Sequence, residues 1–217
     1  MSQAMLALLS DAFLETLWMV GTAAGVALLA GVPLGVVLTV TGPGGILPLP
    51  AIQRGLGAIV NATRSTPFII LMVAIIPLTR LLAGTSIGTG AAIVPLSIAA
   101  VPFFARLVES ALKEIDRGLV EAAQALGATP LQIIWKVLLP EAVPALVRGL
   151  TLTIISLIGY SAMAGAVGGG GLGDLGIRYG YQRFDGVMMA AVVIVLILLV
   201  QLVQSGGDLI ARRLTKT

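Results

Sequence analysis

Five runs of apolar residues, each long enough to cross a lipid bilayer as a helix, constrain this chain more than any other feature. The runs are Phe13–Val40, Ala58–Leu82, Ile87–Val108, Leu146–Val167 and Val187–Ile210. A spanning helix needs about 20 mostly apolar residues, and backbone groups cannot stay unpaired in hydrocarbon, so the runs predict helices rather than strands. Prolines within the runs predict kinks. We therefore expect an all-α integral membrane protein with five transmembrane helices.

The composition favours a single transmembrane domain over residues 1–217. Hydrophobic residues make up 58% of the chain and charged residues 11%, whereas a soluble globular domain carries about 25% charged residues. Residues 1–13 lack the basic region and the cleavage pattern of a signal peptide, so we expect the first helix to be retained.

The chain contains no cysteine and no histidine. Disulfides, thiolate nucleophiles, imidazole bases and the common zinc ligand sets are thereby excluded, and we expect neither a metal site nor catalytic residues. The net charge of +3 is small and scattered along the sequence. It gives no reason to expect nucleic acid as a partner.

Basic residues are distributed unevenly between the two sides of the expected helices. One side holds ten of them: Arg54, Arg64, Arg106, Lys113, Arg117, Lys136, Arg148, Arg212, Arg213 and Lys216. The other side holds three: Arg80, Arg178 and Arg183. Because basic residues accumulate on the cytoplasmic side of a membrane protein, we predict that segment 109–145 and the C-terminus are cytoplasmic. Five spans then place the N-terminus outside.

The segment 109–145 contains a short amphipathic helix. Its apolar side chains recur at i, i+3, i+4 and i+7. They are Leu119, Ala122, Ala123 and Leu126. Glu121 and Gln124 face away from this stripe. Gly127 can adopt the left-handed conformation that ends a helix, so we expect the chain to turn there.

A second amphipathic helix is predicted directly after this turn. Thr129 is its expected N-cap, with Pro130 at the first helical position and Gln132 completing a capping box. The same apolar spacing recurs at Leu131, Ile134, Trp135 and Leu138. Pro140 and Pro144 are expected to punctuate the chain beyond it. Spacing alone leaves open that both helices lie on the lipid headgroups.

One pattern in this segment resembles the signature loop of binding-protein-dependent ABC importer permeases: Glu121-Ala122-Ala123, then Gly127, then Leu139-Pro140. The resemblance implies the type I ABC importer permease fold, with a cytoplasmic coupling loop over about 109–145. In that family the loop seats in a groove of a separate ATP-hydrolysing subunit. ATPase coupling is thus assigned to Glu121, Ala122, Ala123, Gly127 and Pro140. Glu121 is left with two roles, a contact with the partner or a helix cap.

The chain has no ATP-binding machinery of its own. It lacks the Gly-x-x-x-x-Gly-Lys-Ser/Thr phosphate loop. The glycine run 168–173 has no following lysine, and we expect it to be a flexible connection between the fourth and fifth spans. We expect no charged residue deep in the membrane, where proton and sodium relays need one, and we place Glu15 near the outer interface. The free energy for transport is therefore expected from a partner.

The fourth span is the most polar and is a candidate lining for a solute path. Thr153, Ser156, Tyr160 and Met163 follow one another at spacings of three and four residues, so they share one helix face. Hydroxyl groups in membrane helices also bond to their own helix or to a neighbouring helix. Periodicity leaves both interpretations open.

Two pairs of glycines one turn apart lie in the first span. They are Gly21 with Gly25 and Gly31 with Gly35. Such pairs let helix backbones approach closely in lipid. Packing within the subunit is the favoured interpretation, and a dimer face is the alternative.

Similarity to the methionine ABC importer permeases extends over nearly the whole chain. It is carried by the stretches 64–71, 84–88 and 159–165 and by the compact five-span length. The resemblance implies a homodimer in the bacterial inner membrane, two copies of an ATPase that binds ATP and magnesium, and an extracytoplasmic methionine-binding lipoprotein. The chain itself needs no cofactor. The implied cargo is L-methionine together with D-methionine or close derivatives, and Tyr160 and Met163 are placed near the substrate gate.

We thus expect a non-enzymatic permease subunit that works by alternating access. The nearest alternative keeps the family and changes the cargo to another amino acid or a small organic solute. An alternative from a different class is a stand-alone membrane scaffold or secondary carrier without an ATPase. Co-purification with an ATP-binding subunit separates that alternative from the first.

Overall fold

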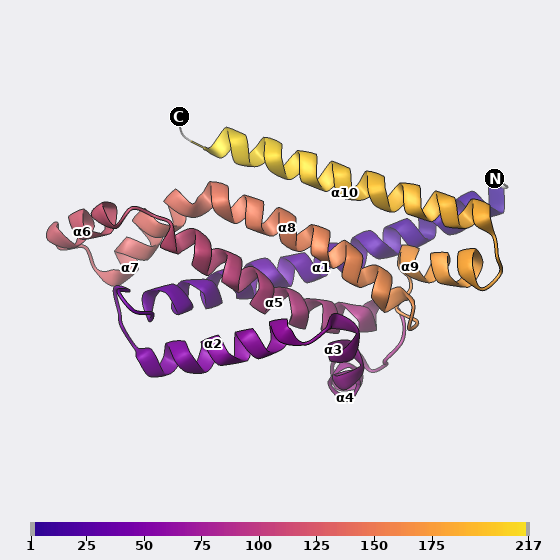
Figure 1. The fold of residues 1–217 in the computed structure, drawn as a ribbon, viewed down its shortest axis with the longest axis horizontal. Helices are drawn as coiled ribbons and strands as arrows, with labels where there is room; N and C mark the ends of the chain where they lie inside the picture. The colour runs from indigo at the N-terminus through magenta and orange to yellow at the C-terminus, as the bar shows by residue number, and fades with distance from the viewer. Residues whose placement is uncertain (1–2, 216–217) are drawn as a thin grey trace.

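The computed structural model describes residues 3–215, and in this range the chain folds into helices joined by short connections. Four helical segments are long and apolar enough to cross a membrane. They are α1 (Gln3–Val40), α5 (Thr89–Lys113), the continuous run Pro130–Gly165 and α10 (Gly186–Leu214). A fifth span is available if the bent pair α2 (Pro50–Ser65) and α3 (Phe68–Ala74) counts as one. The long helices lie side by side along the longest axis of the molecule (Figure 1).

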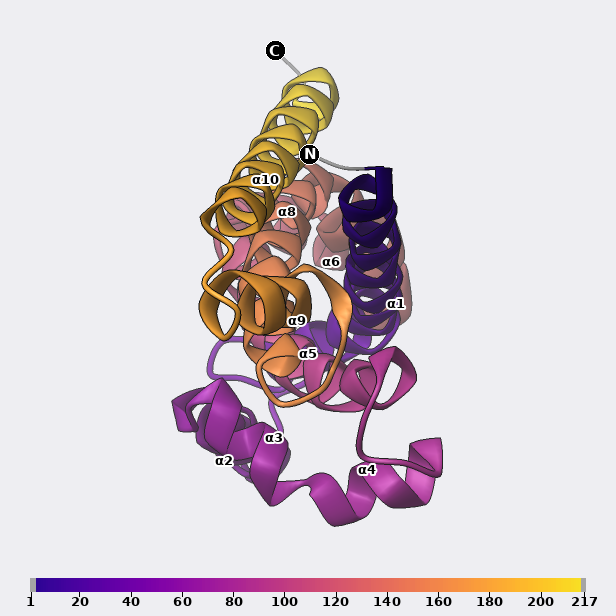
Figure 2. The same cartoon turned by 90° about the vertical axis from the view of Figure 1, so that its right-hand side faces the viewer.

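The second predicted span is not one helix. It is divided between α2, α3 and α4 (Ile76–Ala83), and α2 and α3 meet at an angle of 107°. Pro67 disfavours a helical conformation at the residue before it, and Thr66 is indeed extended, with φ −85° and ψ 124°. The expectation of a single helix over 58–82 is therefore wrong, because Pro67 breaks the helix instead of kinking it. Figure 2 shows α2, α3 and α4 set to one side of the other helices.

The second glycine pair of α1 packs inside the subunit. A Cβ atom at Gly31 would lie 3.0 Å from the Phe104 ring, and one at Gly35 would lie 2.5 Å from the Cβ atom of Val108. The α1 and α5 backbones approach closely only because these side chains are missing. Gly21 and Gly25 differ, since a Cβ atom there would meet nothing within 4 Å. The intramolecular interpretation is thus confirmed for one pair, and the other faces away from the described part of the subunit.

A buried ion-pair cluster fastens α2 to α5. Glu109 is 4% exposed, and it accepts hydrogen bonds from Arg106 and from Lys113 Nζ, the latter at 2.7 Å. Arg106 also donates to the Asn61 Oδ1 atom at 2.9 Å and to the Gly57 carbonyl at 3.1 Å. The hydrophobic spacing of the third span gave no signal for this cluster.

The glycine loop, residues 166–170, leads from α8 (Leu139–Gly165) into α9 (Gly171–Leu175) and a π-helical turn, η2 (Gly176–Tyr181). The first backbone N–H groups of α9 are bound from α1: Gly171 donates to Glu15 and Leu172 donates to the Thr16 hydroxyl at 2.9 Å. Leu172 is fully buried. The expectation of a flexible connection over 168–173 is wrong, because side chains far away in the sequence hold this segment.

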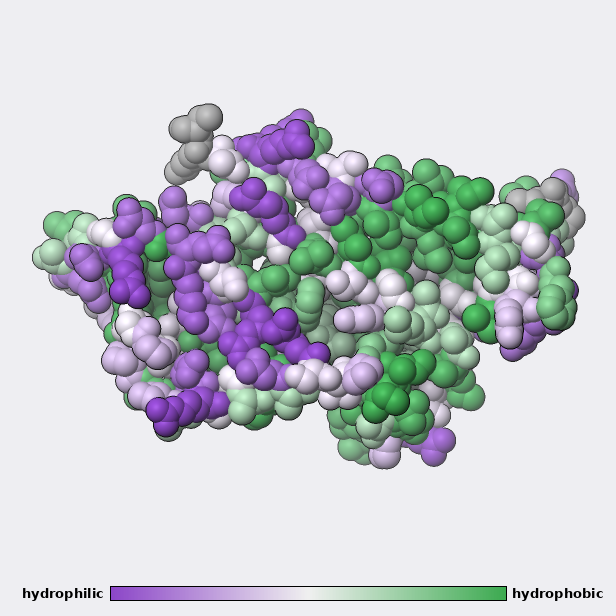
Figure 3. All heavy atoms as spheres, in the orientation of Figure 1, coloured by the Kyte–Doolittle hydropathy of each residue, from purple (hydrophilic) through white to green (hydrophobic). Residues whose placement is uncertain are grey.

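The two ends of the molecule differ in polarity. Hydrophilic residues gather over the half of the molecule that carries α6 (Arg117–Ala125) and α7 (Pro130–Ile133), while the surface beyond the middle is strongly hydrophobic (Figure 3). We call the end with α6 and α7 the coupling end. The opposite end carries α9 and the start of α1 (Figure 1), and we call it the hairpin end.

Candidate functional site

The turn between the two short helices at the coupling end is built as the sequence predicts. Gly127 has φ +78°, in the left-handed region. Its N–H donates to the Gln124 carbonyl at 2.9 Å, and the Ala128 N–H donates to the Ala123 carbonyl at 3.0 Å. This pair of bonds is the Schellman motif, which satisfies the last carbonyls of a helix. The predicted end of the first helix at Gly127 is confirmed.

The start of the second helix is also confirmed. Gln132 N–H donates to the Thr129 hydroxyl at 3.4 Å, and Thr129 N–H donates to the Gln132 side-chain oxygen at 2.8 Å. Pro130 occupies the first turn, where its missing N–H costs nothing. Two orphan donors are therefore satisfied within four residues, so the local sequence fixes the geometry of the turn.

The second helix does not stop at Pro140. It continues from α7 through a π-helical turn, η1 (Ile134–Leu138), directly into α8. The Leu139 N–H bonds to the Ile134 carbonyl, five residues back, so the turn before Pro140 is wider than an α-helical one. Because Pro140 has no backbone N–H to donate, this wider turn accommodates it within a continuous helix. Pro144 lies inside α8, which continues past it to Gly165. The expectation that Pro140 and Pro144 interrupt the helix is therefore wrong.

Both short helices turn apolar side chains to the surface at the coupling end. The exposed ones are Leu119, Ala122, Leu126, Leu131 and Trp135, and we call them the apolar coupling residues. Leu126 is 88% exposed and Trp135 65%. The predicted stripes are only partly right, because Ala123 is half-buried and Leu138 is buried against the hydrophobic core. Exposed apolar side chains grouped in this way are typical of a surface that contacts another molecule.

Glu121 is not a helix cap. Within residues 3–215 its exposed carboxylate makes no hydrogen bond and no ion pair. Asp116 caps α6 instead, accepting from the Gly118 N–H at 2.8 Å. Glu121 lines a surface cavity of about 410 Å³ together with Arg117 and Gln124. Among the described residues Glu121 caps no helix, and its contact with a partner stays a prediction.

The four candidate path residues of the fourth span occupy different environments in α8. Thr153 is 1% exposed and donates to the Gly149 carbonyl at 2.8 Å, and Ser156 donates to the Leu152 carbonyl at 2.9 Å. Both hydroxyls thus bond within their own helix. Met163 is exposed, and Tyr160 is half-buried. Thr153 therefore packs inside the subunit, while the other three reach its surface.

Tyr160 has an aromatic partner that sequence reasoning missed. The Phe68 ring at the start of α3 stacks on it, with ring centroids 4.7 Å apart and planes 8° from parallel. Phe68 is 7% exposed. Within an apolar run, a phenylalanine in a path looks like a phenylalanine in a core, so no local signal singled it out.

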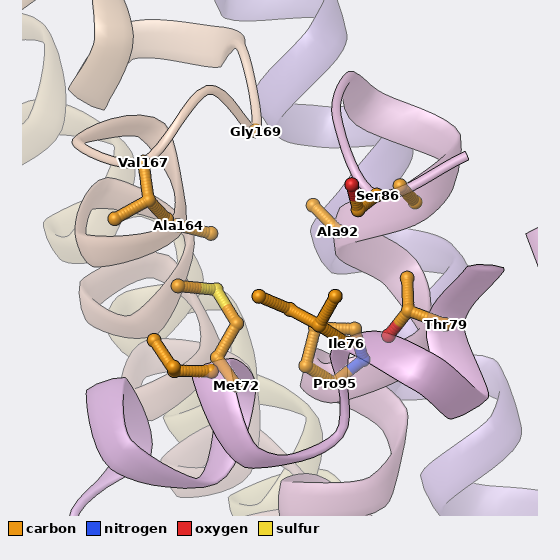
Figure 4. A pocket seen from close by; sticks show the side chains of 11 residues that line it. Met72, Ile76, Thr79, Ser86, Ala92, Pro95, Ala164, Val167 and Gly169 are labelled. Atoms are coloured by element: carbon orange, nitrogen blue, oxygen red, sulfur yellow. The ribbon is translucent and has the colours of Figure 1, made fainter.

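A cavity of about 70 Å³ lies one helical turn beyond this stacked pair, toward the hairpin end. Figure 4 shows its lining from α3, α4, α5, α8 and the glycine loop. The residues include Met72, Ile76, Thr79, Pro95, Ala164 and Val167. Within the described range, no group of three or more aspartate and glutamate side chains is placed to hold a metal ion.

Comparisons with known proteins agree with this arrangement. A probable D-methionine transport system permease protein of Vibrio cholerae is 58% identical over 206 residues, which is 95% of this chain and 92% of that protein. A D-methionine transport system permease protein of Yersinia pestis is 56% identical over 165 residues, or 76% of each chain.

A solved structure of the MetNI methionine ABC transporter in inward-facing conformations matches with a TM-score of 0.98 at 52% identity, covering all of both chains. The family model of the binding-protein-dependent transport system inner membrane component matches residues 31–216. The chain therefore belongs to the family of binding-protein-dependent transport system inner membrane components, with the type I ABC importer permease fold.

Proposed function

We propose that this chain is the permease subunit of an ATP-driven importer that carries methionine, including D-methionine or close derivatives, into the cytoplasm. The cargo is supported by relatives named as D-methionine transport permeases that are 58% and 56% identical to this chain. A structure of a methionine ABC transporter with the same fold adds to this support. The runner-up keeps the mechanism and changes the cargo to another amino acid or a small organic solute.

The observation that carries the proposal is the exposed surface of the coupling end. The apolar coupling residues and the unpaired carboxylate of Glu121 lie on a turn that two local capping motifs hold rigid. A rigid, exposed element of this kind suits docking to a soluble motor. Two copies of a separate ATP-binding subunit dock at the coupling end, and these subunits bind ATP and magnesium. Their motion switches the transmembrane helices between an outward-facing and an inward-facing arrangement. The permease itself catalyses no reaction.

The membrane orientation follows the distribution of charge. The coupling end, where basic residues accumulate, is cytoplasmic. The C-terminal part of α10 lies at the same end, because Leu214 and Thr215 line a cavity together with Asp116 and Leu119. The start of α1 lies at the opposite, external end (Figure 1). The glycine loop and η2 therefore face outside the cell, where the methionine-binding lipoprotein delivers cargo. The protein is a multi-pass component of the bacterial inner membrane.

The working unit is a homodimer of this subunit. The surface of α8 supports this, because Leu152, Ser156, Gly159 and Met163 follow one another at helical spacing and none is fully buried within the subunit. A Cβ atom at Gly159 would meet nothing within 4 Å. A second copy covers this face, and Ser156, Tyr160 and Met163 then border the solute path between subunits. Thr153 supports the packing of α8 from inside.

Reconstitution tests the proposal. Vesicles holding the permease and an ATP-binding subunit, supplied with the binding lipoprotein, are expected to take up labelled methionine only when ATP is hydrolysed. A scaffold or secondary carrier gives no dependence on ATP and no co-purifying ATPase. Competition by other amino acids separates the methionine cargo from the runner-up.

A further inference from the structure

Thr79 stands apart from the other buried threonines in the helices of this chain. Thr16, Thr151 and Thr153 each donate their hydroxyl to the carbonyl four residues earlier. Thr79 is 4% exposed as a residue, and its hydroxyl makes no hydrogen bond among residues 3–215. Its oxygen is not one of the fully buried side-chain atoms that lack a partner, so it keeps some accessible surface. The hydroxyl is therefore free to donate to a molecule in the space that it faces.

The unpaired hydroxyl lines the 70 Å³ cavity. Figure 4 shows Thr79 at one edge of the lining, with its oxygen on the side of Ile76 and Pro95. One ordered water needs about 10–15 Å³ of such volume and two to four polar partners. The cavity is larger than that and supplies few polar groups, which favours a thin apolar occupant over a cluster of waters.

The cavity lies next to the stacked aromatic pair. Met72 and Ala164 line it, and each lies four residues after one member of the Phe68–Tyr160 stack. The stacked rings are therefore about one helical turn away from the cavity along α3 and α8.

The opposite side of the cavity is formed by two connections that are joined to each other. Gly169 of the glycine loop and Ser86 of the α4–α5 connection both line it. The Gly88 N–H donates to the Gly168 carbonyl at 2.8 Å and ties the two connections together. Ser86 in turn accepts a hydrogen bond from Arg80. Both ends of the cavity are thus bounded by groups with defined partners, and Thr79 is the polar group left over.

We propose that this cavity is a binding pocket for the apolar side chain of the transported amino acid, with the Thr79 hydroxyl as its polar contact. The inference rests on the proposed function, which names a cargo with an unbranched thioether side chain. A thioether sulfur is a weak hydrogen-bond acceptor. It fits a narrow, mostly apolar pocket that holds one free donor. The Met72 thioether in the wall is polarizable and adapts to such an occupant.

The test compares the uptake of methionine with that of norleucine, which replaces the sulfur by a methylene group. The ratio of kcat/KM for the two solutes is measured in the reconstituted complex for wild type, Thr79→Val and Thr79→Ser. Since the same binding lipoprotein serves all three, its own preference cancels between variants. Loss of one neutral hydrogen bond is expected to lower the preference for methionine about two- to tenfold in Thr79→Val. Thr79→Ser retains the hydroxyl and the preference.

Thr63→Val is the matched control, because the Thr63 hydroxyl bonds to the Ile59 carbonyl at 3.0 Å within its own helix. It leaves the ratio unchanged. A second measurement uses the absence of native cysteine: methionine is expected to protect the thiol of Met72→Cys from a small maleimide, whereas aspartate does not protect it. An unchanged ratio in Thr79→Val, or no protection by methionine while wild type still imports it, overturns the pocket alone. Failure of wild-type uptake overturns the proposed function itself.

Discussion

The Glu15 carboxylate accepts a hydrogen bond from the backbone N–H of Gly171 at 2.7 Å, although 156 residues separate the two in the chain. Thr16, the next residue along α1, accepts from the Leu172 N–H. A Cβ atom at Gly171 would lie 2.7 Å from the Thr16 hydroxyl oxygen, so glycine is needed for this approach. Two neighbouring residues of α1 thus cap the helix that follows the glycine loop.

Removing this carboxylate is expected to loosen the hairpin end. Glu15→Ala leaves the Gly171 N–H without its acceptor, which costs about 1–2 kcal/mol for a charge-assisted bond. Hydrogen exchange at Gly171 and Leu172 is expected to accelerate by roughly five- to thirtyfold. Asp11→Ala, one turn earlier on the same helix, is the control, because Asp11 is exposed and has no partner among the described residues. Equal exchange rates in both variants contradict the capping role of Glu15.

The turn at Gly127 sets the second prediction. Gly127→Val places a β-branched residue at φ +78°, a conformation that such residues adopt rarely and at a cost of about 1–3 kcal/mol. The helix turn distorts, so uptake and ATPase stimulation are expected to fall while membrane insertion stays normal. Gly127→Asn is the matched variant, since asparagine tolerates the left-handed region. If the valine variant transports like wild type, the turn does not transmit motion.

Glu121 sets the third prediction. Its carboxylate is unpaired among the described residues, so Glu121→Lys reverses its charge without breaking an internal bond. In the proposed function this charge contacts the ATP-binding subunit. Truncating or reversing one member of a buried charge pair at an interface costs about 2–5 kcal/mol. Affinity for the ATPase, measured with detergent-solubilised subunits, is expected to fall by at least roughly tenfold. Glu114→Lys makes the same charge change at another exposed, unpaired glutamate of this segment. Comparable losses in both variants indicate a general charge effect and refute a specific contact.

The Arg106–Glu109 pair sets the fourth prediction, which concerns stability. Arg106→Ala leaves the buried Glu109 carboxylate without its main partner and frees α2 from α5, at a cost of about 3–5 kcal/mol. The Lys113 side chain is 52% exposed, so Lys113→Ala removes the other ion pair of Glu109 for less than about 1 kcal/mol. The melting temperature of the solubilised complex reports both changes. If Lys113→Ala lowers the melting temperature as much as Arg106→Ala does, Arg106 is not the main partner of the buried Glu109 carboxylate.

Local features were predictable because the residues that make them are neighbours in sequence. The left-handed Gly127 and the Thr129–Gln132 capping box need only a few consecutive residues, and both are confirmed. Apolar length predicted the spans other than the second, which is divided at Pro67. Proline was harder to interpret, because its effect depends on what surrounds it. Pro67 breaks a helix, whereas Pro140 sits within a continuous one behind a π-helical turn.

Contacts between distant segments were not predictable from one sequence. The Arg106 contacts with Asn61, 45 residues away, join segments that have no local signal for each other. The same holds for the stacking of Phe68 on Tyr160 and for the hydrogen bond from the Gly171 N–H to Glu15. Hydroxyl periodicity grouped Thr153 with Met163, and packing separated them, because one is buried in the subunit and the other is exposed. Three of the four expected path residues still lie at the surface of α8.

The dependence of methionine uptake on ATP hydrolysis by a partner tests the central claim most directly. Initial rates are measured in vesicles with the permease, the ATP-binding subunit and the binding lipoprotein, with either ATP or a non-hydrolysable analogue at the coupling end. The predicted result is uptake with ATP and none with the analogue, and the ATP-driven uptake falls in Gly127→Val and is retained in Gly127→Asn. Equal uptake with ATP and the analogue, or uptake by the permease without an ATP-binding subunit, would contradict the account.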